Sequence, residues 1–231
     1  MPEYIDRDGP SLLVIGGARS GIGTAVANYA VKRDWNVYVP DLYVLDVTKQ
    51  GTIERYLDRH PRFDYIVYSV GWQKLQFIEE LDFDVLARIN DLNMVGYLRV
   101  VQALVKHQSG GNVCAIVSTG ATTPMRGSVG YCSTKAALLM AIRCMARELA
   151  PAWIMTGISP GVVDETPMTK SVDEQVMRAR GWSREEMMEY ELKTVPMGRR
   201  VKREEVGAAT LMMLTAPDMI TGSIMDLSGG K

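Results

Sequence analysis

The stretch Ser11-Leu-Leu-Val-Ile-Gly-Gly-Ala-Arg-Ser-Gly-Ile-Gly23, which continues as Thr24-Ala-Val-Ala-Asn-Tyr-Ala-Val-Lys-Arg33, decides the fold. An apolar run typical of a strand leads into a glycine turn and then into a helical pattern. Glycines allow a tight turn and a close approach of the backbone to a ligand, and a helix N-terminus offers free N–H groups to a phosphate. The spacing is G-x-x-x-G-x-G rather than the G-x-G-x-x-G of the standard dinucleotide fingerprint. By itself, the pattern fits either a phosphate cradle or an ordinary turn.

Strand patterns and helical patterns alternate along the whole chain of 231 residues. This alternation predicts an α/β fold with a doubly wound, Rossmann-type parallel sheet, in which ligands bind beyond the carboxyl ends of the strands. The length and a hydrophobic fraction of 47% suit a single domain, residues 1–231, with a large core. We expect strands at 12–15, 37–39, 43–47, 65–70, 113–118, 154–159 and 223–227, and helices near 21–33, 50–59, 84–107, 130–149 and 203–215.

The connection between the second and third predicted strands is unusually short. Only Pro40, Asp41 and Leu42 separate them. A parallel connection normally needs roughly ten or more residues and usually contains a helix. Either segment 43–47 is still an adjacent parallel strand that is reached by a tight path, or this edge of the sheet is reduced. In both cases the helix between strands 2 and 3 is missing or reduced.

A tyrosine and a lysine stand four residues apart in Gly130-Tyr-Cys-Ser-Thr-Lys135. If this segment is helical, Tyr131 and Lys135 share one face. A nearby ammonium favours the phenolate, which would bring a tyrosine pKa of about 10 closer to neutral. Ser118 precedes them, at the end of the apolar run 113–117. An ordinary amphipathic helix would show the same spacing, so the pair alone does not identify a site.

Together these motifs resemble the short-chain dehydrogenase/reductase family. The glycine turn, Asn93, Ser118, Tyr131 and Lys135 occur in the family's order, and the resemblance extends from about residue 11 to residue 230. Pro160-Gly-Val-Val-Asp-Glu-Thr166 looks like the family's proline-glycine segment, and Asp226-Leu-Ser-Gly-Gly230 is similar to its C-terminal strand. The resemblance implies an oxidoreductase that transfers a hydride between a nicotinamide cofactor and a secondary alcohol or ketone.

The resemblance also assigns roles to four residues. Tyr131 would be the general acid and base, while Lys135 would lower the pKa of Tyr131 and hold the nicotinamide ribose. Ser118 would bind the substrate oxygen. Asn93 would help a water connect Lys135 to solvent, although a polar residue of an ordinary helix would look the same. A protein of this fold that senses or scaffolds without turnover is the alternative, and the complete set of four residues favours the enzyme.

The choice of cofactor depends on Asp41, just after the second strand. A carboxylate there would accept hydrogen bonds from the adenosine ribose and repel a 2′-phosphate, so NAD is expected rather than NADP. Arg19 in the glycine turn could attract a 2′-phosphate, and Asp41 could be only a turn residue. Asp46-Val-Thr48 resembles the family segment that touches adenine, which favours a strand at 43–47. The expected cofactor contacts are Gly17, Arg19, Ser20, Gly21, Ile22, Gly23, Asp41, Asp46, Val47, Gly71, Tyr131, Lys135, Pro160, Gly161, Val163 and Thr166.

Two positions depart from the family pattern. Gly16 stands where the family usually has threonine, and Tyr68-Ser-Val-Gly71 replaces Asn-Asn-Ala-Gly, so that only the glycine is retained. Both changes affect the support of the cofactor turn and the central strand. The groups that transfer protons are unaffected.

Substrate specificity is expected in the methionine-rich segment 162–199, which we interpret as a lid. The pair Ser183 and Glu186 forms a capping box that predicts a short helix. Methionine side chains adapt to irregular apolar shapes, which suits a substrate pocket, but helix packing or a subunit interface would use them equally well. The residues expected to contact the substrate are Ser118, Trp72, Met125 and Met168.

Composition excludes several other functions. A net charge of −1 without a basic face argues against nucleic-acid binding, and no apolar stretch is long enough to span a bilayer. His60 and His107 have no spaced partner, so no metal site is expected. The three cysteines have no C-x-x-C spacing. We expect a cytoplasmic protein that acts on a small alcohol or carbonyl substrate, and the resemblance implies a homotetramer built on the helices near 84–107 and 130–149, with the C-terminal strand near a second interface.

Overall fold

The central sheet has the strand order β1-β3-β2-β4-β5-β6-β7 in the computed structural model, which describes residues 4, 5, 9–18, 21–60 and 62–231. In this described part of the chain, β2 to β7 pair in parallel, and β1 runs antiparallel to β3. The predicted doubly wound parallel sheet is therefore confirmed. The strands are β1 (Tyr4–Ile5), β2 (Ser11–Ile15), β3 (Asn36–Tyr38), β4 (Tyr65–Tyr68), β5 (Gly111–Ile116), β6 (Trp153–Pro160) and β7 (Ile224–Leu227).

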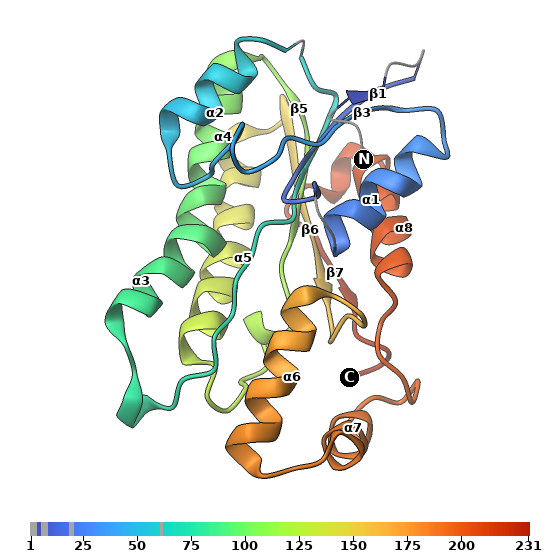
Figure 1. Ribbon diagram of the computed structural model, residues 1–231. Helices are drawn as coiled ribbons and strands as arrows, with labels where there is room; N and C mark the ends of the chain where they lie inside the picture. The colour runs from blue at the N-terminus through green and yellow to red at the C-terminus, as the bar shows by residue number, and fades with distance from the viewer. Residues whose placement is uncertain (1–3, 6–8, 19–20, 61) are drawn as a thin grey trace.

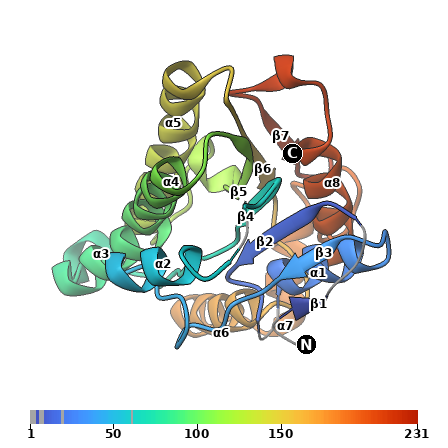
Figure 2. The same ribbon diagram turned by 90° about the horizontal axis from the view of Figure 1, so that it is seen from above.

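Helices cover both faces of the sheet (Figure 1 and Figure 2). Helices α1 and α8 pack together on one face, whereas α2, α4 and α5 cover the other, with α3 against α5. The helices are α1 (Ile22–Val31), α2 (Gln50–Leu57), α3 (Phe83–Asn90), α4 (Gly96–His107), α5 (Val129–Leu149), α6 (Pro167–Arg180), α7 (Arg184–Leu192) and α8 (Arg203–Leu214). Short turns are η1 (Ile78–Glu80), η3 (Thr119–Ala121) and η4 (Asp218–Ile220), and η2 (Asp91–Val95) is a π-helical turn. No helix among the described residues is long and apolar enough to cross a bilayer.

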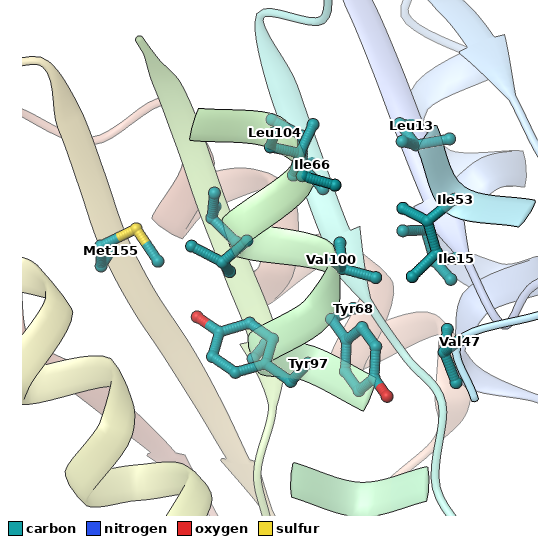
Figure 3. Packing of buried hydrophobic residues seen from close by; sticks show 14 of the residues in the cluster. Leu13, Ile15, Val47, Ile53, Ile66, Tyr68, Tyr97, Val100, Leu104 and Met155 are labelled. Carbon is teal, nitrogen blue, oxygen red and sulfur yellow. The ribbon is translucent and has the colours of Figure 1, made fainter. Parts of the chain in front are cut away.

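Alternate residues of each strand fill two separate cores. Leu13 and Ile15 of β2 pack toward α2 and α4, whereas Leu12 and Val14 pack toward α1 and α8. Figure 3 shows the first of these cores, in which Val100 of α4 faces the sheet. A strand whose residues are buried on both faces reads as a continuous apolar run, which is how β2 appears in the sequence.

The strand expected at 43–47 is wrong, because this segment forms a turn. The carbonyl oxygen of Asp41 accepts hydrogen bonds from the backbone N–H groups of Val44 and Leu45, both at 2.9 Å. These donors are used inside the turn and cannot join a sheet ladder. Over the described residues between β3 and α2, the structure contains neither a strand nor a helix. The edge of the sheet is therefore reduced, and β1 pairs with β3 in its place.

Helices α6 and α7 form most of the expected lid segment, beyond the carboxyl ends of the strands (Figure 1). The side chain of Thr166 caps α6 by accepting from the backbone N–H of Thr169, and Pro167 occupies the first turn. The predicted capping box between Ser183 and Glu186 is confirmed at the start of α7. Helix α6 was not among the expected helices.

A buried arginine fastens α6 and α7 to the rest of the chain. Arg200 is 3% exposed at its side chain and donates to both carboxylate oxygens of Asp173 on α6, at 2.8 and 2.9 Å. It also donates to both carboxylate oxygens of Glu191 on α7, at 2.8 and 2.7 Å. Helices α6 and α7 are thus joined to each other through one buried guanidinium.

Candidate active site

The glycine turn leaves an open cradle at the start of α1. A Cβ at Gly23 would lie 2.6 Å from the Cα of Gly17, so both positions must be glycine for the turn and helix to approach. Gly21 has φ +82°, and a Cβ there would meet nothing within 4 Å. The hydroxyl of Thr24 donates to the carbonyl of Gly17 at 2.7 Å, which fixes the turn. Because the first turn of α1 holds no acidic residue, its N–H groups suit a pyrophosphate.

Gly16, the position where the family usually has threonine, has a structural reason to be glycine. Its φ is +93°, and a Cβ would lie 2.8 Å from the backbone of Ser69 and Val70 at the end of β4. The backbone of β4 therefore takes the space that a side chain would need. The expected contacts Arg19 and Ser20 lie outside the described residues.

Three of the predicted catalytic residues converge on one wall of a cavity. Tyr131 and Lys135 lie on α5 and are 7% and 3% exposed, and Ser118 follows β5. The side chains of Ser118 and Tyr131 are hydrogen-bonded, and Ser118 also accepts from the N–H of Gly120 at 3.1 Å. A buried phenol with one hydroxyl partner can exchange a proton with an oxygen that enters beside it.

Burial shifts the pKa values of both Tyr131 and Lys135. Burial raises the pKa of Tyr131, and the hydrogen bond from Ser118 opposes this only in part. The ammonium of Lys135 lies 5.8 Å from the ring centroid of Tyr131 and donates to the carbonyl of Ile116 at 2.8 Å. Burial lowers the pKa of Lys135 itself to about 8. Lys135 can therefore gain or lose a proton near neutral pH.

Asn93 lies in the π-helical turn between α3 and α4 and is fully buried. Its Oδ1 accepts from the backbone N–H of Trp72 at 2.7 Å, and its Nδ2 donates to the carbonyl of Trp72 and to Thr134 Oγ1 at 3.0 and 3.1 Å. Asn93 thus ties the end of β4 to α5, next to Lys135. Single π turns inside α-helices are frequent at functional sites.

Tyr68, the second departure from the family pattern, supports this turn. Its hydroxyl donates to the carbonyl of Leu92 at 2.5 Å, and a Cβ at Gly96 would lie 2.7 Å from the same hydroxyl. The tyrosine therefore fits only because residue 96 is glycine. Burial raises the pKa of Tyr68, so the phenol stays protonated and donates at any ordinary pH.

The cavity in front of these residues has a volume of about 410 Å³. Of the predicted site residues, it is lined by Ser118, Tyr131, Lys135, Met125, Met168, Ile22, Gly71, Pro160, Gly161, Val163 and Thr166. Trp72 does not line it, because its ring stacks with Arg88 on α3, 4.8 Å from the guanidinium carbon. Asn93 lies behind the lining, and Gly17, Gly21, Gly23, Asp41, Asp46 and Val47 lie outside this cavity.

Asp41 and Asp46, expected near the adenosine, both accept hydrogen bonds from neighbouring residues of the chain. Asp41 Oδ1 accepts from the backbone N–H of Tyr43 at 3.2 Å. Burial alone would raise the pKa of Asp46, but hydrogen bonds from Thr48 and Lys49 hold it below its ordinary value. Val47 is buried in the core. Asp46 therefore stays charged and holds its own turn.

A family model described as short chain dehydrogenase matches residues 41–177, which is more than half of the chain. The chain belongs to the short chain dehydrogenase family.

Relatives agree with this assignment. The NAD-dependent glycerol dehydrogenase of Listeria innocua is 27% identical, over 94% of this chain and 92% of its own length. The sorbitol-6-phosphate 2-dehydrogenase of Klebsiella pneumoniae is 26% identical, over 100% of this chain and 99% of its own length. A variant of actinorhodin polyketide ketoreductase with NADPH has the same fold, with a TM-score of 0.88 and 24% identity over 97% of this chain and 98% of its own. The protein is thus an oxidoreductase-family member with a nicotinamide-binding fold.

Sequence reasoning about this short chain dehydrogenase missed most of the lid wall. Helix α6 is polar overall, and its apolar row is narrow. The N-cap Thr166 followed by Pro167, and the spacing of Met168, Val172 and Val176, were the signals that could have located it. These three residues lie on successive turns of α6 and line the cavity. The missed lining residues include Leu75, Arg126, Ser128, Thr169, Val172, Asp173, Val176, Arg180 and Glu191.

Proposed function

We propose that this short chain dehydrogenase transfers a hydride between NAD and a secondary alcohol or ketone, with Tyr131 as the general acid and base. The observation that carries the proposal is the convergence of Ser118, Tyr131 and Lys135 on one wall of the cavity. The open glycine cradle at α1 fits a dinucleotide pyrophosphate and supports the choice of a nicotinamide cofactor.

Each residue of the site has a distinct task in this proposal. In the direction of reduction, Tyr131 donates its proton to the substrate oxygen, and Ser118 holds that oxygen by a hydrogen bond. When bound, a nicotinamide supplies or accepts the hydride at carbon. Lys135 then returns a proton to the phenolate, which its pKa of about 8 allows near neutral pH. The cation of Lys135 also favours the phenolate once it forms.

Asn93 is a positioning residue in the proposal. Both hydrogens of its amide are donated, to Trp72 and Thr134. A water that relays protons to Lys135 would therefore be held by the backbone of the π turn, while the Asn93 side chain keeps that turn against β4 and α5.

We propose NAD over NADP because Asp41 follows β3 at the edge of the sheet, where a carboxylate repels a 2′-phosphate. The NAD-dependent relative from Listeria innocua supports this choice, and the neighbour with NADPH does not. We further propose one domain over residues 1–231, with 162–199 as the lid, and a homotetramer. Exposed apolar side chains on α3 and α5, such as Phe83 and Met140, support burial of these helices between subunits.

The test of the proposed function combines binding and turnover. Fluorescence titration with NADH and NADPH measures the two dissociation constants, and a panel of secondary alcohols, hydroxy acids and matching ketones is assayed with each cofactor. We expect tighter binding of NADH and turnover of at least one class of the panel. If NADH binds while no panel member is converted, the chain is a nucleotide-binding sensor and the proposal is wrong.

A further inference from the structure

The outer end of the active-site cavity carries two arginines. Met168, at the start of α6, lies at the catalytic end, since its Cε and the Nζ of Lys135 are 3.5 and 3.6 Å from where a Gly71 Cβ would stand. Helix α6 then runs away from the strand ends (Figure 1), and its last residue, Arg180, also lines the cavity. Met168 and Arg180 lie on the same helix and their side chains lean the same way along it, so about three turns of helix separate Arg180 from the catalytic end.

Arg126, in the loop before α5, also lines the cavity. The segment that begins at Leu75 joins the two arginine-bearing elements. The backbone N–H of Leu75 donates to Gln175 on α6 at 2.9 Å, and that of Gln76 donates to the carbonyl of Gly127 at 2.7 Å. The loop of Arg126 and the outer half of α6 are thus joined through this one segment.

Both guanidinium groups are held against aromatic rings. The guanidinium carbon of Arg180 lies 4.7 Å from the ring centroid of Trp182 and 5.7 Å from that of Tyr190, and that of Arg126 lies 5.4 Å from Phe77. Stacking fixes the plane of a guanidinium and leaves its N–H edge free for a carboxylate or a phosphate. Among the described residues, no carboxylate pairs with either arginine.

The two acidic residues of the lining are both bound to Arg200. All four carboxylate oxygens of Asp173 and Glu191 accept hydrogen bonds from this buried guanidinium, which neutralises one of the two negative charges. The other charged side chains that line the cavity are Arg126, Arg180, Lys135 and Lys231. Between the catalytic end and the arginines the wall is apolar, with Val172 and Val176 of α6.

We propose that Arg126 and Arg180 form an anion-binding subsite that selects alcohols or ketones with a carboxylate or phosphate group at the far end of an apolar chain. This inference rests on the proposed function and defines its substrate class. The apolar middle of the cavity accepts the chain, and the separation along α6 sets its length.

Binding can be measured without turnover. Octanoate, octyl phosphate and octanamide share one apolar chain and differ in charge, so calorimetry on the protein, with and without saturating NAD, isolates the anionic group. We expect octanoate or octyl phosphate to bind at least about tenfold more tightly than octanamide, because guanidinium groups form charge-assisted hydrogen bonds with an anion. If octanoate has the lower dissociation constant, the subsite favours a carboxylate; if octyl phosphate does, it favours a phosphate.

Matched variants assign the preference to residues. The double variant Arg126→Gln/Arg180→Gln should bind the three ligands within about twofold of each other. Arg178→Gln removes the same charge from the same last turn of α6, but Arg178 does not line the cavity, so the preference should persist. The subsite is overturned if the wild-type protein binds octanamide as well as the anions, or if the double variant keeps the preference.

Turnover separates this inference from the proposed function. The methyl-ketone derivative of decanoate, with its carbonyl at the penultimate carbon, is assayed beside its methyl ester. Equal kcat/KM for acid and ester overturns the subsite and leaves the oxidoreductase intact. A protein that prefers the anions through its two arginines but converts no member of the whole panel keeps the subsite and loses the proposed function.

Discussion

The ammonium of Lys135 donates a hydrogen bond to the backbone carbonyl of Ile116 at 2.8 Å. Both Lys135 and the neighbouring Tyr131 are buried. This contact places a buried cation at the carboxyl end of β5. Because burial disfavours the charged form, the pKa of Lys135 falls from 10.5 to about 8. The same burial that makes the group useful for proton exchange costs folding free energy.

We predict that Lys135→Met removes a pH dependence of stability. Below pH 8 the folded and unfolded wild-type chains both hold the lysine proton, and the cost of the buried ammonium is fully present. Between pH 8 and 10.5 the folded chain releases this proton first, so stability rises with pH by up to about 3 kcal/mol from this group. Urea unfolding of both proteins from pH 7 to 10 checks the difference, and parallel curves would contradict the burial of a charged Lys135.

Substitution of Arg200 should destabilise the protein far more than substitution of its neighbour Arg199. Arg200→Gln leaves Asp173 and Glu191 as buried, unpaired charges and should cost about 3–5 kcal/mol. Arg199→Gln breaks an exposed ion pair with Glu205 and should cost about 0–1 kcal/mol. Chemical denaturation measures both free energies of unfolding, and limited proteolysis reports whether the lid opens in Arg200→Gln. Similar losses in the two variants would contradict a lid held by Arg200.

Tyr68 and Gly96 should be energetically coupled. Gly96→Ala places a methyl group 2.7 Å from the Tyr68 hydroxyl and 2.9 Å from Val47, and should cost about 1–3 kcal/mol. Tyr68→Phe loses the hydrogen bond to Leu92, at about 1 kcal/mol. The double variant should be less destabilised than the sum by about 0.5 kcal/mol or more, because the hydroxyl that clashes is gone. Additive losses in a double-mutant cycle would show that the two residues act independently.

Gly16 tests the backbone of the glycine turn, and Gly51 of α2 serves as the control. Gly16→Ala forces a side chain into φ +93° against the backbone of Ser69, and should destabilise by more than about 1 kcal/mol. Gly51→Ala, in α2 with open space around it, is the control and should stabilise by about 0.5–1 kcal/mol. Thermal unfolding ranks the two variants. If Gly16→Ala leaves the free energy of unfolding unchanged, the turn relaxes easily around a side chain. Backbone crowding would then not explain why this chain has glycine where the family usually has threonine.

Local sequence patterns predicted the parts of the fold that depend on local chemistry. The run before Gly16 is apolar on both faces, so β2 and the glycine turn could be located directly. Segment 43–47 has the composition of a strand, but the backbone of Asp41 captures its donors. These hydrogen bonds depend on the path of the backbone, so they cannot be predicted from the types of residue in the segment.

The sequence predicted that Ser118, Tyr131 and Lys135 would lie together, but it did not predict the electrostatics around them. The spacing of Tyr131 and Lys135 identifies the pair, yet the carbonyl of Ile116 that holds the ammonium comes from another element. Trp72 follows β4 toward the site, but stacking on Arg88 turns its ring away from the cavity. These outcomes depend on contacts between elements distant in the sequence.

The most direct test of the central claim compares wild-type protein with Tyr131→Phe, which removes one oxygen atom from the buried site. Both proteins are titrated with NADH and assayed on the best substrate of the alcohol and ketone panel. We predict equal dissociation constants for NADH and a fall in kcat of about 10²–10⁴, the contribution of one positioned acid and base. An unchanged kcat in Tyr131→Phe would contradict the account, because the proton would then come from another group.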